Sequence, residues 1–204
     1  HVIGAPKWLG TSVPHAKFCA TMRQYVPLGT PKVVFAYRLA YQGFFGNAPW
    51  YAMPAYTTMG PKPDYDGLGG YRTVRGIMLN RVQGLHTGFY NIELRYRFID
   101  FKLWNQNIAF AVSGFTDGTH VFKGYDMTLK NPEIINAVPG TVNEYKKNLY
   151  NEYVFNRKDG FHGSAGAGLR FIMNENFIVA FEYARCFNKQ DGNGAFYINI
   201  GFLF

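Results

Sequence analysis

Strict alternation of apolar with polar or small residues marks the last ten residues of the chain. On one face of this predicted strand lie Phe196, Ile198, Ile200, Phe202 and Phe204. On the other face lie Tyr197, Asn199, Gly201 and Leu203. A strand with bulky apolar groups on one face and small or polar groups on the other suits a membrane barrel with a wet interior. A half-buried strand of a soluble sandwich also alternates and is the alternative.

Six further segments alternate in a similar way, with turn residues between them. The seven predicted strands are 16–28, 32–44, 89–101, 108–115, 165–173, 177–187 and 195–204. Short links follow the first, third and fifth strands, and long links follow the second, fourth and sixth. The longest links are 45–88 and 116–162, and residues 132–135 are a candidate short helix. Outer-membrane barrels sort their turns in this way, so we expect an all-β, antiparallel transmembrane β-barrel.

Composition restricts how such a chain can cross a membrane. It has 204 residues, of which 48% are hydrophobic and 18% aromatic, and it shows neither a repeat nor a linker. We therefore expect a single domain over residues 1–204. No uninterrupted apolar run reaches the ~20 residues that a transmembrane helix needs. A barrel is the other structure that satisfies every backbone group in lipid.

The formal net charge of +8 raises the possibility of a nucleic-acid partner. The basic residues do not gather in the sequence, because five arginines stand singly within alternating segments. These are Arg23, Arg38, Arg95, Arg97 and Arg170. Nucleic-acid binding proteins usually collect basic residues on one patch, so we expect no nucleic-acid partner.

The sequence shows no pattern typical of an enzyme or a metal site. Cys19 and Cys186 are far apart and form no metal-binding or CxxC spacing, and either a disulfide or two free thiols is compatible with it. Ser113 and Ser164 have no recognisable triad partners. Four of the five histidines, His15, His86, His120 and His162, fall in predicted loops or near strand ends, as surface residues do. We expect no catalytic residue, metal or cofactor.

Four stretches, in order, resemble motifs of one family. The link after the second strand contains Leu68-Gly69-Gly70-Tyr71-Arg72-Thr73-Val74-Arg75-Gly76-Ile77. This is similar to the "GG…VRG(F/Y)" loop of the BamA/TamA superfamily of outer-membrane assembly and secretion factors. Stretches 91–95 and 167–171 resemble two later strands of that family. The ending resembles its terminal strand and assembly signal through Asn199, Ile200, Gly201, Phe202 and Phe204.

The resemblance implies a sixteen-stranded barrel of which this chain supplies about the last seven strands. Further strands, and any periplasmic domains, would then precede residue 1. It also implies that the Val74-Arg75-Gly76 loop folds into the lumen, where acidic residues hold Arg75. Glu93 and Asp117 are the candidate acids, since a guanidinium inside a barrel needs a carboxylate partner.

Two departures from the family pattern stand out. In the stretch 110–114, Val112 takes the place of the aspartate of a "Phe-x-Asp-x-Gly" element, and we expect Asp117 to lie nearer the loop end. Ile77 replaces the usual aromatic residue after Val74-Arg75-Gly76. Both departures predict a loop that is held more weakly or differently.

The resemblance implies a non-enzymatic protein of the bacterial outer membrane that inserts other barrels or translocates a polypeptide through a lateral seam. Its expected partners are outer-membrane lipid and lipopolysaccharide, unfolded outer-membrane protein clients, and accessory lipoproteins or companion subunits. One alternative is a small self-contained outer-membrane barrel acting as an adhesin or structural protein. Another is a soluble ligand-binding barrel.

Overall fold

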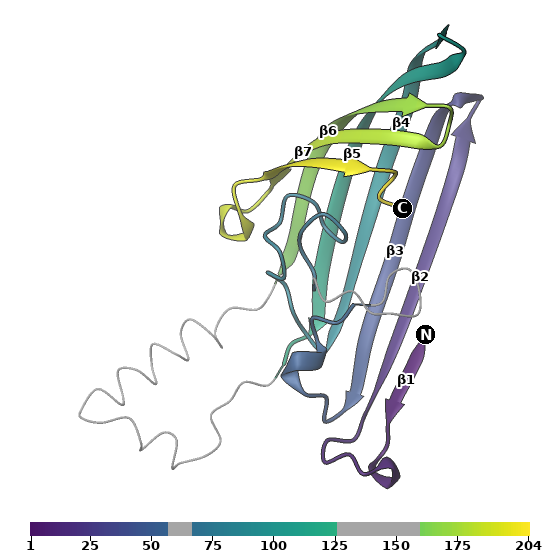
Figure 1. Cartoon of the computed structure of the whole chain (residues 1–204). Helices are drawn as coiled ribbons and strands as arrows, with labels where there is room; N and C mark the ends of the chain where they lie inside the picture. Colours follow the sequence, from purple (N-terminus) through teal and green to yellow (C-terminus); the bar gives the residue numbers. More distant parts are fainter. Residues whose placement is uncertain (57–66, 126–159) are drawn as a thin grey trace.

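A single sheet of eight antiparallel strands, ordered as in the sequence, forms the described part of the chain (Figure 1). The computed structural model describes residues 1–56, 67–125 and 160–204. The strands are β1 (Val2–Ala5), β2 (His15–Leu28), β3 (Thr30–Gly46), β4 (His86–Leu103), β5 (Gln106–Lys123), β6 (Phe161–Met173), β7 (Phe177–Cys186) and β8 (Ala195–Ile200). Three short 3-10 turns lie between them: η1 (Lys7–Leu9), η2 (Trp50–Ala52) and η4 (Lys189–Asp191). The predicted all-β, antiparallel fold class is confirmed.

The strand count among the described residues is eight rather than the predicted seven. The additional strand, β1, pairs with the first residues of β2 and ends at Ala5, just before Pro6. Proline lacks the N–H that a ladder needs, so Pro6 limits the length of β1 without preventing it. The candidate helix at 132–135 lies outside the described residues.

Strand β5 differs most from its prediction. It continues to Lys123, although the run from Thr116 to Thr119 resembles a loop in sequence. These residues pair with β4 on one side and β6 on the other, including Asp117 with Asn91 and Ser164. Pairing on both sides compensates for the low strand propensity of Asp and Gly.

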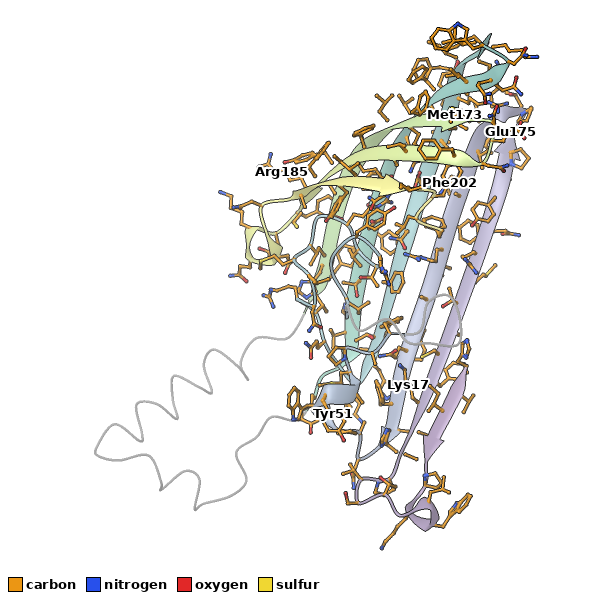
Figure 2. The ribbon with its side chains drawn as sticks, in the orientation of Figure 1. Lys17, Tyr51, Met173, Glu175, Arg185 and Phe202 are labelled. Carbon is orange, nitrogen blue, oxygen red and sulfur yellow. The ribbon has the colours of Figure 1, made fainter. Side chains whose placement is uncertain are left out.

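The links are sorted by length as predicted. Tight turns join β2 to β3, β4 to β5 and β6 to β7, and longer segments join the other neighbours. Trp104 and Asn105 both have positive φ, which is typical of a type I′ hairpin turn. Met173 and Glu175 lie at the tight-turn end of the sheet, whereas Lys17 and Tyr51 lie toward the opposite end (Figure 2).

The two faces of the sheet differ in chemistry. The segment 67–85 folds against one face, which we call the covered face; the other is the open face (Figure 1). Buried polar or charged side chains of the covered face are Arg38, Gln42, Asn91, Glu93, Asp117, Ser164, Arg170 and Glu182. Exposed apolar side chains of the open face are Leu39, Leu94, Tyr96, Val112, Leu169, Phe181, Tyr183, Phe196, Ile198 and Ile200. This is the reverse of a soluble protein, in which charged side chains are rarely buried.

A bulge in β4 keeps the open face apolar along the whole strand. The register with β5 shifts between Arg97 and Ile99. Because a bulge inserts one extra residue, it reverses which residues face each side. Tyr96 before the bulge and Phe101 and Leu103 after it therefore all lie on the open face, where each is more than two-fifths exposed.

The end of β8 departs from the predicted alternation. Gly201 has a φ of 93°, and the chain leaves the sheet there. Phe204 is 5% exposed, with its ring 5.0 Å from the Arg38 guanidinium and 6.4 Å from the Tyr25 ring. The prediction that Phe204 shares a face with Ile198 is wrong, because a glycine in the left-handed region interrupts the two-residue period.

Replacing Gly201 with Val tests this turn. A β-branched residue at positive φ is strained, so we expect Gly201→Val to lower the free energy of unfolding by about 1–3 kcal/mol. It should also increase the solvent exposure of Phe204. Guanidinium-induced unfolding followed by intrinsic fluorescence measures the first effect.

Gly114→Val is the matched control. A Cβ at Gly114 meets nothing within 4 Å, and its φ is outside the positive range. This variant should stay within about 0.5 kcal/mol of wild type. Equal losses in both variants would contradict a special role for the Gly201 turn.

Candidate functional site

The segment 67–85 is ordered by its own hydrogen bonds. The Thr73 hydroxyl accepts from the Gly69 N–H at 3.0 Å, and the Val82 N–H donates to the Leu68 carbonyl at 3.0 Å. Gly69 has a φ of 117°, and a Cβ there would lie 2.0 Å from the Met78 carbonyl oxygen. Glycine is therefore required at this position in the turn.

Arg75 lies at the centre of the site, with no exposed surface. Its Nε and Nη2 donate to the two carboxylate oxygens of Asp117 at 2.8 and 3.0 Å. Nη1 lies 3.4 Å from Glu93 and 3.2 Å from Glu182. The Phe115 ring centre is 3.5 Å from the Arg75 guanidinium carbon. Carboxylates from β4, β5 and β7 thus surround one guanidinium, and the contact with Asp117 is bidentate.

Two further arginines balance the charge of the three carboxylates. Arg95 lies 3.0 Å from Glu93. Arg170 lies 2.6 Å from Glu93 and 2.5 Å from Glu182. We call Arg75, Arg95, Arg170, Glu93, Asp117 and Glu182 the Arg75 cluster. Its three cations and three anions leave it formally neutral, as a group of charges removed from water requires.

The surroundings of Arg75 keep it charged. Burial alone would lower the pKa of its guanidinium, but Asp117 first, then Glu93 and Glu182, raise that pKa above its ordinary value. Arg75 is therefore a permanent cation that needs its carboxylates at any physiological pH.

Hydrogen bonds to the backbone of Arg75 and Gly76 hold the loop to the last three strands. The Ser164 hydroxyl donates to the Arg75 carbonyl, and the Cys186 thiol donates to the Gly76 carbonyl. The Gly76 N–H donates to the Tyr197 hydroxyl at 2.8 Å. A Cβ on Gly76 would lie 3.1 Å from the Ala184 Cβ, so the loop backbone approaches β7 closely. The dipeptide Arg75-Gly76 therefore contacts β6, β7 and β8.

The structure brings both sequence-predicted acids to Arg75. Asp117 lies nearer the loop end of β5 than Val112 does, as predicted, and it is still paired within the sheet, between Asn91 and Ser164. Val112 faces the open side and is 41% exposed. Phe115 and Asp117, two positions apart on β5, both contact the Arg75 guanidinium.

Glu182 was missed by the sequence reasoning. It is the one acidic residue of the alternating segment 177–187 and falls between Phe181 and Tyr183, which face the open side. A lone acid on the polar side of an alternating strand was the available signal.

The other predicted loop and terminal residues occupy distinct positions. Val74 and Ile77 are buried in an apolar cluster with Leu68 and Val82. Gly70 has a φ of 81° and donates its N–H to the Ile77 carbonyl. Asn199 and Ile200 lie in β8 and pair with β7. Phe202 lies after the end of β8, with its ring centre 4.3 Å from the Arg95 guanidinium.

One sequence interpretation gains detail and another needs correction. Three of the five arginines that stand singly in the sequence, Arg38, Arg95 and Arg170, are buried on the same face of the sheet, as expected of polar positions in alternating strands. Neighbouring strands bring them together, which linear spacing does not reveal. His162 is not a surface histidine: it is buried, with Nδ1 2.9 Å from Asp191.

Further observations concern other kinds of site. Cys19 and Cys186 are both buried free thiols. Within the described ranges, no group of three or more His, Cys, Asp or Glu side chains is placed to hold a metal ion. In the same ranges, no helix is long and apolar enough to cross a membrane. No protein-family model, no curated protein and no solved structure matches the chain.

The Arg75 cluster predicts a large effect of truncating its central residue. Arg75→Ala leaves Asp117 buried without its partner, so we expect a loss of about 3–5 kcal/mol in the free energy of unfolding. Denaturant titration measures it. The exposed pair Lys32 and Asp100 is the control, because water screens this pair and its removal should have a far smaller effect.

A double variant separates the coupling energy of the ion pair from the cost of truncating each side chain. Arg75→Ala combined with Asp117→Ala removes both charges, so its loss should be smaller than the sum of the two single losses. Additive losses would show that Arg75 and Asp117 are not energetically coupled.

Gly76→Ala tests the close approach of the loop to β7. The positive φ of 87° costs about 1–2 kcal/mol for an alanine, and crowding against Ala184 should increase the loss. Gly10→Ala is matched in backbone conformation, with a φ of 82° and nothing within 4 Å of its Cβ. Thermal unfolding should show a larger loss for Gly76→Ala; equal losses would argue against tight packing at Ala184.

Proposed function

We propose that this chain is part of a BamA/TamA-type β-barrel of the bacterial outer membrane. In this proposal it helps to insert other outer-membrane proteins, or to translocate a polypeptide, by offering the free edge of β8 to a client strand. It acts without a cofactor or chemical catalysis. Its partners are membrane lipid and lipopolysaccharide, unfolded client barrels, and accessory lipoproteins or companion subunits.

The reversed polarity of the sheet carries the membrane assignment. Exposed apolar side chains on the open face suit a hydrocarbon surround, and buried charges on the covered face suit a polar barrel interior. An aqueous protein with so large an apolar surface would associate or aggregate. Strands in lipid must also close into a barrel, because unpaired backbone groups are costly there.

Closure requires partners for the two edges of the sheet. At one edge, β1 pairs only with His15–Phe18 of β2, and the rest of β2 pairs with β3 alone among the described strands. At the other edge, β8 has β7 as its one partner among the strands that the structure describes. The sixteen strands implied by the family resemblance would close the proposed barrel between these edges. In this proposal β8 pairs imperfectly with the first strand, so its edge opens to a client.

The hydrogen-bond pattern of β8 identifies the groups that would receive a client. The Gly201 N–H donates to Ile178 of β7, and antiparallel pairing alternates from there. The backbone groups of Asn199 and Tyr197 therefore face β7, whereas those of Ile198 and Phe196 face the free edge. An extended segment adding to such an edge gains main-chain hydrogen bonds.

The Arg75 cluster gives the loop a role in this scheme. Glu182 on β7 and Tyr197 on β8 contact Arg75 and Gly76, so the loop is attached to the two strands beside the edge. A displacement of β8 would therefore disturb the loop. The adhesin alternative gives this buried charge network no role beyond stability.

Blocking one edge group tests the proposal. Ile198→Pro removes an N–H that faces the free edge and spares the ladder with β7, whereas Ile198→Ala keeps that N–H. We expect Ile198→Pro to slow client insertion about tenfold, because one hydrogen bond is worth about 1–1.5 kcal/mol. The assay follows folding of an unfolded outer-membrane protein into lipid vesicles that contain the chain.

Ile198→Ala should insert clients at nearly the wild-type rate. If wild type does not accelerate insertion at all, the assembly function is wrong and the adhesin alternative is favoured. If both variants match an active wild type, the free edge of β8 is not the client site. If wild type does not associate with membranes, the assignment as a membrane barrel is itself wrong.

A further inference from the structure

A groove with a volume of about 260 Å³ lies on the open face across β3, β4 and β5. It is close to the ends of these strands that the longer links join. Gly88 of β4 and Gly118 of β5 form part of its floor. Its open-face side chains are Leu39, Tyr41, Tyr90, His120, Phe122 and Phe161. In the proposed barrel this face meets lipid, so the occupant of the groove comes from the membrane.

Aromatic rings shape the groove by lying against glycine. A Cβ on Gly118 would lie 2.6 Å from ring atoms of both Tyr90 and Phe161. These two rings are stacked, with their centroids 6.2 Å apart. A Cβ on Gly88 would lie 3.0 Å from the Phe122 ring. Larger residues at the two glycines would displace the rings, so the shape of the groove depends on glycine in two adjacent strands.

Three basic side chains lie on the long-link side of this groove. His86 of β4 pairs with Lys123 of β5, and His120 pairs with Gly88. Directly paired residues share a face of the sheet, so all three basic residues belong to the open face. Lys123 is exposed, and no carboxylate among the described residues forms an ion pair with it. We call His86, His120 and Lys123 the basic rim.

The imidazole of His86 is oriented to donate a hydrogen bond. Its Nδ1 lies 2.7 Å from the Tyr41 hydroxyl oxygen, and its ring meets the Phe45 ring edge-on at 5.2 Å between centroids. With the Tyr41 hydroxyl donating to Nδ1, the proton of the neutral ring is on Nε2, which can donate in turn. Ring N–H groups beside an ammonium group suit the oxygens of a phosphate.

We propose that the groove and the basic rim bind one molecule of lipopolysaccharide, with an acyl chain in the groove and phosphate groups at the basic rim. This inference rests on the proposed function and assigns a binding site to one of its partners. Long loops of outer-membrane barrels lie on the extracellular side, so the basic rim faces the leaflet that lipopolysaccharide forms. Basic residues at a membrane surface attract anionic lipid headgroups.

Lipid binding to the full chain in detergent micelles tests this site. The probes are diphosphorylated lipid A, the same lipid without its phosphates, and phosphatidylglycerol. Native mass spectrometry counts the lipid molecules that each protein molecule retains. We expect one tightly held molecule of diphosphorylated lipid A, retained at least about tenfold more tightly than either other lipid, since each basic residue near an anionic lipid contributes about fivefold. Phosphatidylglycerol has a single phosphate and therefore reaches fewer donors of the rim.

Removing the cation of the basic rim should reduce the preference for phosphate. Lys123→Gln should weaken binding of diphosphorylated lipid A about fivefold and leave binding of the dephosphorylated lipid unchanged. Lys102→Gln is the matched control, because Lys102 is an exposed lysine at the tight-turn end of β4. Its distance from the rim exceeds the screening length of about 10 Å, so its loss should leave both affinities unchanged.

Filling the groove should act on the acyl chain instead. Gly88→Leu should weaken both forms of lipid A about threefold, because the chain loses packing contacts. Gly114→Leu is the control on the same face, since a Cβ there meets nothing within 4 Å, and it should change neither affinity. Leu39→Trp fills the groove from β3 and provides a second variant if Gly88→Leu does not fold.

The outcomes separate this site from the proposed function. If wild type enters membranes but retains the phosphorylated and dephosphorylated lipids equally, the site is wrong and the barrel assignment stands. Retention of phosphatidylglycerol as tight as that of lipid A overturns lipopolysaccharide as the occupant. A preference for phosphate that survives Lys123→Gln in full overturns the basic rim. If wild type neither enters membranes nor retains any of the three lipids, the inference and the proposed function fail together.

Discussion

The buried guanidinium of Arg75 is the constraint on which the rest of the structure depends. Removing a charge from water costs several kcal/mol, which only well-placed opposite charges and hydrogen bonds offset. Asp117, Glu93 and Glu182 come from three strands, so the register of β4, β5 and β7 must be correct for the loop to bind. A slip of one residue would turn any of these carboxylates to the open face. Folding of the loop and pairing of the strands are thus coupled.

The same network explains why a charged interior is compatible with an apolar exterior. Arg95 and Arg170 complete the neutral cluster, so its three buried carboxylates are matched by three buried guanidiniums. The bulge after Arg97 keeps the open face apolar along β4. Without the extra residue, uninterrupted alternation would place polar residues of the last part of β4 on that face. In the proposed membrane setting, these two features give the sheet one face suited to lipid and another suited to a polar interior.

The end of the chain links the sheet edge to this interior. Gly201 turns the chain out of β8, and Phe202 and Phe204 then lie against the guanidiniums of Arg95 and Arg38. Contacts between an aromatic face and a cation contribute about 0.5–2 kcal/mol each. They hold the residues after Gly201 against the covered face, beyond the end of β8 at Ile200.

The sequence by itself determined the strands and the sorting of their links, because both depend on local properties. Two-residue alternation and turn residues located most strands within a few positions, and the resemblance of the stretch around Val74-Arg75-Gly76 to a family motif singled out the loop. Tertiary structure decided what local patterns cannot encode. Thr116–Thr119 become strand only because neighbours pair with both sides, and Glu182 meets Arg75 only because β7 lies beside β6. The burial of His162 and Phe204 likewise depends on partners distant in the sequence, Asp191 and Arg38. Long-range pairing creates these environments, and no single segment of the chain carries the information for them.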